Sequence, residues 1–192
     1  SDSHSEAAGI GTPRAWIAIS KAAVDADHDA IIAPFRARRA FVSCGPFVRL
    51  TAEDGTDIGG RTDVDADGRI RFAVRVEAPS WMAIDRVRLL ENGMPVADVS
   101  LADWPRPEGL APAVRYADTM VAEPLADAWY VVEVIGSGGL GPIDGGENPY
   151  ALTNPISVDD GDGIWTPPAE TGTARPRSMR RFPVDTTPHH HH

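Results

Sequence analysis

Two side chains near the start of the sequence, Asp2 and His4, have the types and spacing of a metal-ligand pair. Residues two apart on an extended strand project from the same face, so one ion can contact both. A carboxylate together with an imidazole suits zinc, iron or manganese. Asp2 and His4 are therefore candidate ligands of a divalent metal, zinc or manganese, although such a pair alone is a weak signal. The histidines at 189–192 are typical of a purification tag and are set aside. The remaining histidine, His28, is a weaker candidate for a third ligand.

The sequence offers few residues for other kinds of catalytic site. Cys44 is the single cysteine, which excludes a disulfide framework and a cysteine-based zinc site. A Ser-His-Asp or Cys-His site would have to use His4 or His28 as its base. The sequence contains no GxSxG, P-loop or GxGxxG motif. Most common enzyme chemistries are thereby excluded.

Two acidic segments are candidates for cation binding. Asp159, Asp160 and Asp162 lie in the segment VDDGDG, which predicts a possible cation loop. Residues 63–68 (DVDADG) open like an EF-hand calcium loop, but its twelfth position is Val74 instead of Glu. An alternating strand also follows where an EF-hand has a helix. We therefore interpret residues 63–68 as a polar hairpin turn.

Composition and charge limit the partners. The 192 residues include 18 Lys and Arg against 28 Asp and Glu, which gives a formal net charge of −10. Proteins that follow phosphate groups need a basic surface, so we expect no nucleic acid and no anionic membrane as partner. No apolar run approaches the roughly 20 residues that span a bilayer. The preference for Arg over Lys, with a single Lys, is typical of GC-rich bacterial coding.

The pattern from residue 41 to 165 predicts a mainly β domain. The segment RIRFAVRVEA at 69–78 alternates apolar and charged residues, and Asn92-Gly93 is a strong hairpin signal. With 18 Gly and 17 Pro, many turns are expected. We predict an antiparallel β-sandwich of the Ig-like, jelly-roll or lectin-like kind. Its strands are expected at 40–43, 47–52, 70–77, 84–91, 96–101, 115–122, 129–135 and 155–158, and its core at Phe72, Val74, Val76, Val87, Leu89, Val131 and Val132.

The two ends of the sequence differ from this domain. Residues 15–20 alternate like a short strand, and residues 25–39 are predicted as a helix that Pro34 should kink or shorten. Residues 166–188 are rich in Pro, Thr and Arg, and we expect them to form an extended C-terminal arm before the tag, distinct from the N-terminal residues. Four tryptophans could stack on a sugar, but burial in the sandwich is the commoner role; they are Trp81, Trp104, Trp129 and Trp165.

Several segments, in order, resemble the PHP (polymerase and histidinol phosphatase) metallohydrolases of the CehA/McbA type. They are SDSHS at 1–5, GTPRAWIAI at 11–19, ARRAFVSCGPFVRL at 37–50, VRVEAPSWMAIDRVRLLENG at 74–93, DAWYVVEVIGSGG at 127–139 and PYALTNPISVDDGDG at 149–163. The resemblance covers about residues 1–165. It implies that Asp2 and His4 belong to a metal site and that a C-terminal β domain follows the catalytic barrel.

The resemblance also implies that residues 1–40 are the remnant of a truncated barrel, its last strand and helix. The family's His-x-His segment and bridging acid have no counterpart here, Cys44 stands where Asn is expected, and Arg39 where Gly is expected. The family hydrolyses small-molecule phosphoesters, carbamates or esters. The first expectation is thus a metal-dependent hydrolase of activated phosphoesters or esters. The alternative is a non-catalytic β-sandwich module, lectin-like or used in assembly.

Loss of the barrel should leave apolar side chains of residues 1–40 uncovered. We therefore predict a homodimer through residues 1–40. A second copy, the Ser1 amine or His28 would then complete the ligands of the metal.

Overall fold

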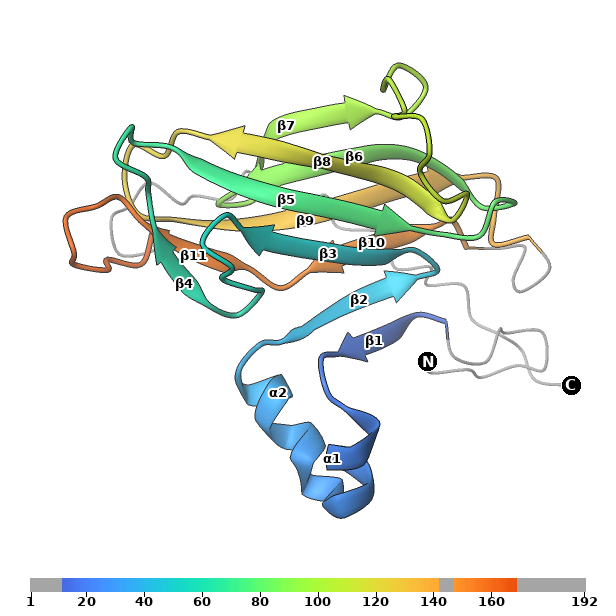
Figure 1. Cartoon of the computed structure of the whole chain (residues 1–192), viewed down its shortest axis with the longest axis horizontal. Coiled ribbons are helices and arrows are strands. Elements are labelled where there is room, and N and C mark those ends of the chain that lie inside the picture. Colours follow the sequence, from blue (N-terminus) through green and yellow to red (C-terminus); the bar gives the residue numbers. More distant parts are fainter. Residues whose placement is uncertain (1–11, 142–146, 169–192) are drawn as a thin grey trace, which may run out of the picture.

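Two layers of strands form the body of the protein (Figure 1). The computed structural model describes residues 12–141 and 147–168, apart from the side chains of Ala26 and His28. The larger sheet contains β1 (Arg14–Ile17), β2 (Ala40–Cys44), β4 (Arg61–Asp63), β6 (Ala83–Glu91), β7 (Met94–Ser100), β9 (Ala128–Ser137), β10 (Tyr150–Thr153) and β11 (Ile156–Asp159). The smaller sheet contains β3 (Phe47–Ala52), β5 (Ile70–Glu77) and β8 (Val114–Ala122). The predicted β-sandwich is confirmed.

The long strand β9 organises the larger sheet. One side of β9 pairs with β6, and β6 pairs in turn with β7. The other side pairs with β10 near its C-terminal end and with β11 near its N-terminal end. Beyond β10 lie β2 and β1, and beyond β11 lies β4. All these pairs are antiparallel except β11 with β4. The order of the strands places β7 and β1 at opposite edges of the sheet.

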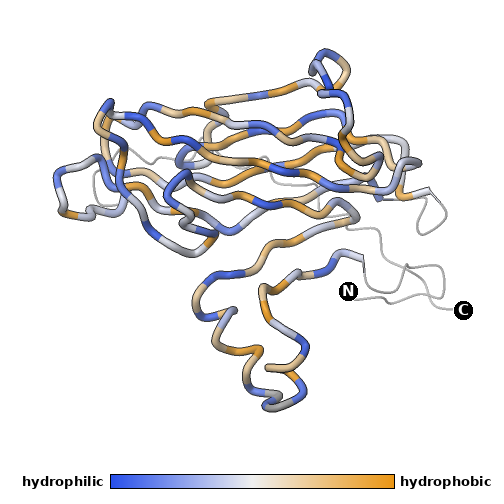
Figure 2. The backbone as a smooth tube through the Cα atoms, in the orientation of Figure 1, coloured by the Kyte–Doolittle hydropathy of each residue, from blue (hydrophilic) through white to orange (hydrophobic). Residues whose placement is uncertain are grey.

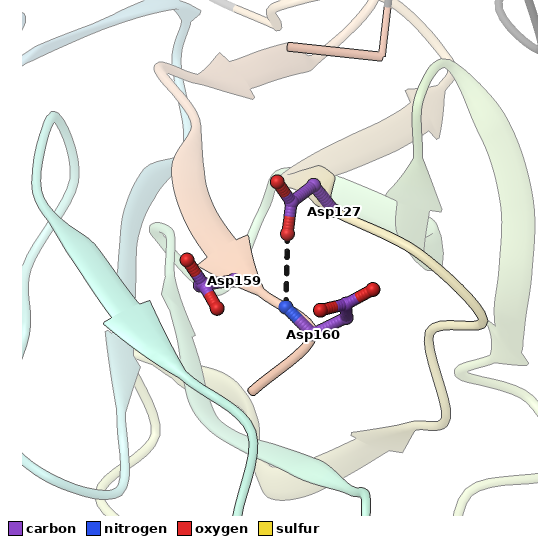
Figure 3. Close-up of side chains that lie close together, drawn as sticks. All are labelled: Asp127, Asp159 and Asp160. Atoms are coloured by element: carbon purple, nitrogen blue, oxygen red, sulfur yellow. Dashed lines mark hydrogen bonds between the residues drawn. The ribbon is translucent and has the colours of Figure 1, made fainter. Parts of the chain in front are cut away.

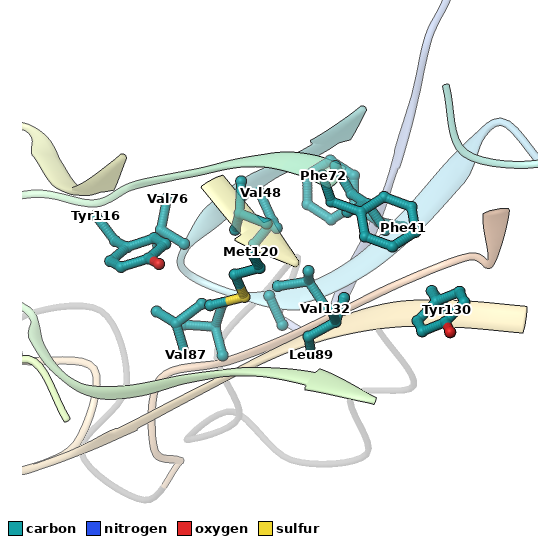
Figure 4. Close-up of a cluster of buried hydrophobic side chains, with 14 of the residues drawn as sticks. Phe41, Val48, Phe72, Val76, Val87, Leu89, Tyr116, Met120, Tyr130 and Val132 are labelled. Carbon is teal, nitrogen blue, oxygen red and sulfur yellow. The ribbon is translucent and has the colours of Figure 1, made fainter. Parts of the chain in front are cut away.

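The alternation seen in the sequence places the core. In β5 the residues Ile70, Phe72, Val74 and Val76 are buried, and the residues between them are half-buried or exposed. Every core position predicted from the sequence is buried, but Val131 lies outside the core cluster that contains the others. Figure 2 shows apolar and polar residues alternating along the strands, and Figure 4 shows the apolar side chains gathered between the two sheets.

Tryptophan burial is the prediction that the structure contradicts. Trp16 and Trp81 are exposed, while Trp104, Trp129 and Trp165 are only half-buried. Tyr116, Tyr130 and Phe72 are instead the largest side chains that are fully enclosed. Burial raises the pKa of Tyr116 to about 12, and the nearby Asp118 carboxylate acts in the same direction.

The single helix predicted over residues 25–39 is also wrong in its limits. The structure has α1 (Lys21–Ala26), a 3₁₀ turn η1 (His28–Ile31) and α2 (Ile32–Arg36). The Ser20 hydroxyl caps α1 by accepting a hydrogen bond from the Ala23 N–H at 3.2 Å. Asp27 then has an extended backbone and caps η1 through its own carboxylate, which interrupts the helix.

We call residues 12–39, which contain β1 and these short helices, the arm. The helices pack chiefly on one another and project from the sandwich in Figure 1. The strand β1 attaches the arm by pairing with β2. Within residues 12–141 and 147–168, none of the helices has the length and apolar character needed to cross a membrane.

Candidate metal centre

The metal ligands predicted first, Asp2 and His4, lie outside the described residues. His28 begins η1 in the arm, and its side chain is not described. The metal site on these residues therefore stays a prediction.

A different group of carboxylates does come together at the end of the larger sheet. Asp127, Asp159 and Asp160 each place a carboxylate oxygen within 4.8 Å of the others (Figure 3). Asp127 immediately precedes β9, and Asp159 is the last residue of β11. Because Ala128 of β9 pairs with Val158 of β11, the residues flanking this pair must lie side by side. The register of two strands thus builds the group.

Backbone N–H groups donate hydrogen bonds to several oxygens of this carboxylate cluster. Asp127 Oδ1 accepts a hydrogen bond from Asp160 N at 2.9 Å, and its Oδ2 accepts one from Thr166 N. Asp159 Oδ1 accepts from Gly161 N at 3.0 Å and from Gly163 N at 3.1 Å. These bonds fold residues 159–166 against the start of β9.

Two glycines make this tight loop possible. Gly161 and Gly163 have φ angles of 98° and 78°, in the left-handed region that side chains with a Cβ disfavour. Their N–H groups consequently converge on Asp159. Asp162 was predicted to share the cation loop, but it lies outside the carboxylate group and instead accepts from Ile164 N at 2.7 Å.

The donor set of this group suits a hard cation. Asp127 and Asp159 are 7% and 4% exposed, and no Lys or Arg of the described ranges forms an ion pair with Asp127, Asp159 or Asp160. Carboxylate oxygens are the ligands that Ca²⁺ prefers, whereas zinc sites usually include nitrogen or sulfur. A cation here would have to compete with the backbone N–H groups. In this structure these carboxylates therefore serve mainly to hold the loop at 159–166 in place.

Sequence reasoning found Asp159 and Asp160 but missed Asp127. Only the β9–β11 register brings Asp127 to the loop, and a single sequence does not reveal the pairing of strands this far apart. The signal available was a lone acidic residue directly before a strongly apolar strand.

The EF-hand-like segment at 63–68 forms a polar turn, but not the predicted hairpin, because β4 before it and β5 after it belong to different sheets. Asp65 N donates to Arg69 O at 2.7 Å, and Gly68 N donates to Asp65 O at 2.9 Å. The Arg71 guanidinium binds both Asp65 and Asp67. Its hydrogen bond to Asp67 holds the pKa of that carboxyl below its usual range. Arginine thus supplies the positive charge for these carboxylates.

In comparisons with protein-family models, with curated proteins and with solved structures, no match to this chain was found.

Proposed function

We propose that this chain supplies the non-catalytic accessory sandwich of a PHP-type metallohydrolase of phosphoesters or esters. In this proposal the arm joins the sandwich to the catalytic part. The observation that carries it is the uncovered apolar surface of the arm, which lies next in sequence after the candidate ligands Asp2 and His4.

Apolar side chains gather on the outer side of the arm and on the neighbouring strands β2 and β10. Ile32, Phe35 and Val42 are 44%, 48% and 49% exposed, and α2 contains no buried residue. Phe35 and Val42 line a hollow of about 200 Å³ together with Ala15 and Leu152. Ala15, Val42 and Leu152 are aligned across β1, β2 and β10, so they form one row on the same face. Contiguous apolar surface of this kind marks an interaction site.

Trp16, on the other side of the arm, contacts the sandwich although it stays 37% exposed. The Trp16 ring stacks on Phe41 with centroids 6.1 Å apart and meets Phe47 edge-on at 5.3 Å. Phe41 is buried and Phe47 half-buried. One side of the arm thus holds to the sandwich and the other is left for a partner.

Two alanine variants test whether the outer side is open. In dilute protein, Phe35→Ala should change the free energy of unfolding by less than about 0.5 kcal/mol, because the side chain is 48% exposed and lies at the surface. Phe41→Ala, the matched control, should cost about 3 kcal/mol, because it leaves a cavity in packed surroundings. Urea denaturation measures both. A cost for Phe35→Ala as large as that for Phe41→Ala would mean that the chain covers its own arm, and the proposal would fail.

Hydrolysis by this chain alone is the second candidate. It is favoured by the position of the arm directly after Asp2 and His4, because two copies docked through their arms would bring together two Asp and two His. Catalytic zinc usually has three protein ligands and an open position, which one chain does not obviously supply. A divalent ion there would supply Lewis-acid chemistry toward a phosphoryl or acyl oxygen.

Activity measurements separate the two candidates. The chain is assayed with an aryl phosphotriester and an aryl ester, with chelator and then with added zinc or manganese. Hydrolysis by the chain predicts turnover that depends on metal and on protein concentration and is lost in both Asp2→Ala and His4→Ala. An accessory domain predicts no metal-dependent turnover and no effect of either substitution.

A further inference from the structure

A hollow of about 530 Å³ opens at the edge of the sandwich opposite the arm. It lies between the start of β6, the end of β7, the following loop and the start of β8. Its lining includes Asp85, Arg86, Ser100, Trp104, Arg106 and Arg115. Arginine side chains thus reach one hollow from two strands in different sheets and from a loop.

Backbone carbonyl groups hold two of these arginines in place. The Arg106 guanidinium donates to Val114 O, to Ala111 O at 2.9 Å and to Leu110 O at 3.1 Å. Arg115 Nη1 donates to Met82 O at 2.9 Å and to Pro79 O at 3.1 Å. Both side chains are therefore fixed before any ligand arrives, which lowers the entropy lost on binding.

The charges of these two arginines are not neutralised by partners. Carbonyl oxygens are uncharged, and within the described part of the chain neither Arg106 nor Arg115 forms an ion pair. Arg86 differs, because its Nη2 lies 2.7 Å from Asp98 Oδ2. Asp85 is the one acidic residue in the lining. The hollow is thus a positive site on a protein whose net charge is −10.

Trp104 adds a fixed aromatic surface. Its indole N–H donates to Asp118 Oδ2 at 3.3 Å, and its ring lies 5.0 Å from that of Tyr116. The volume of the hollow is within the range of small-molecule sites. An aromatic ring beside arginines suits a ligand that combines an oxyanion with a ring bearing C–H groups.

We infer that this hollow binds a sugar-sized oxyanion, in which a phosphate or a carboxylate contacts Arg106 and Arg115 and the sugar ring lies against Trp104. A guanidinium group has five N–H donors, so the bonds to carbonyl oxygens leave at least two N–H groups on each of these arginines for an oxyanion of either kind. The inference is independent of the role proposed for the arm, which lies at the other edge of both sheets.

Calorimetric titration of the whole chain tests this inference. The probes are glucose 6-phosphate and glucuronate, which distinguish phosphate from carboxylate, with glucose as the neutral control. We expect at least one anion to bind about tenfold or more tightly than glucose at low salt, and added salt to weaken the binding. If neither anion binds more tightly than glucose, the inference is wrong.

Three variants locate the binding. Arg115→Gln should weaken anion binding about tenfold, because it removes a charged donor. Ser100→Asp should also weaken anion binding, because it adds a negative charge to the lining. Ser100 lies opposite Arg86 in the β6–β7 pair and accepts none of the hydrogen bonds that hold Arg106 and Arg115 in place. Arg69→Gln makes the same charge change as Arg115→Gln at an exposed site outside the hollow, and should leave binding unchanged. Equal losses in Arg69→Gln and Arg115→Gln would overturn the inference.

Discussion

Asp127 ties three segments together through one carboxylate. Its oxygens accept hydrogen bonds from Asp160 N, just after β11, and from Thr166 N, while its backbone leads into β9. Asp127→Ala leaves two N–H groups without their acceptor and should lower the free energy of unfolding by about 2–3 kcal/mol. Asp162→Ala, which removes an exposed carboxylate from the same loop, should cost clearly less. Urea denaturation of both variants measures the difference, and equal costs would contradict the role given to Asp127.

A pH dependence is expected from Asp54. The Thr62 hydroxyl donates to Asp54 Oδ2 at 2.7 Å and, against a smaller effect of burial, holds the pKa of Asp54 below its usual range. A carboxyl with a lowered pKa in the folded state stabilises the fold above its unfolded pKa, and this contribution is lost as pH falls through the folded value. Thr62→Val removes the donor and should cost about 1 kcal/mol at neutral pH, a modest loss because Asp54 is exposed.

The pH profile of that variant identifies the cause. As pH falls through the lowered pKa of Asp54 in the folded protein, which lies below the usual 3.8, the stabilities of the original protein and of Thr62→Val should converge, because Asp54 becomes protonated in both. Urea denaturation at neutral and acidic pH gives the two differences. A difference that stays constant with pH would show that the hydroxyl acts through packing alone.

At the level of elements, the arm meets the sandwich at a glycine. A Cβ on Gly59 would lie 2.0 Å from Ala37 O, at the end of α2, and the φ of Gly59 is +83°. Gly59→Ala should therefore displace the arm and lower the free energy of unfolding by more than the strain of a positive φ, which is about 1 kcal/mol. Faster proteolysis between residues 21 and 39 should accompany this loss.

The control for Gly59→Ala is Gly55→Ala. Gly55 has a φ of +90° but nothing within 4 Å of the added Cβ, so this variant carries the backbone strain without the collision. If the two variants lose the same free energy of unfolding and are cleaved by protease at the same rate, the position of the arm does not depend on the contact at Gly59.

Strands with clear alternation were predicted well from the sequence, because burial of one face determines both their pattern and their place. The limits of β3 and β5 agree with the prediction to the residue. The strands β4 and β10 were missed, since each is short and is held by its neighbours: β4 by parallel pairing with β11, and β10 by β2 and β9. The helix α1 was missed because Ser20, its N-cap, was assigned to the end of the strand expected at 15–20.

At the level of the whole molecule, the arm predicts the association state of the isolated chain. Without a catalytic partner, a second copy is the available cover for Ile32, Phe35 and Val42. Burying large apolar side chains contributes roughly 1.5–3 kcal/mol each, so several together can hold a dimer at high concentration. Light scattering should show a dimer that dissociates on dilution.

The matching variant places a charge on this surface. Phe35→Asp should give a monomer at concentrations where the original chain is dimeric, whereas Val121→Asp, at an exposed apolar residue of β8, should leave the dimer intact. A chain that is monomeric at every concentration would contradict self-association through the arm.

The three pairings of β9 have a consequence for how the protein opens. Its backbone is engaged by β6 on one side and by β10 and β11 on the other, so fraying at either sheet edge leaves it enclosed. Amide hydrogens of residues 130–134 should exchange with solvent only on global unfolding, and those of β1 and β7 much sooner. Because β6, its longest partner, is separated from it by β7 and β8, β9 should also gain its full protection late in refolding, after these distant parts of the chain have met.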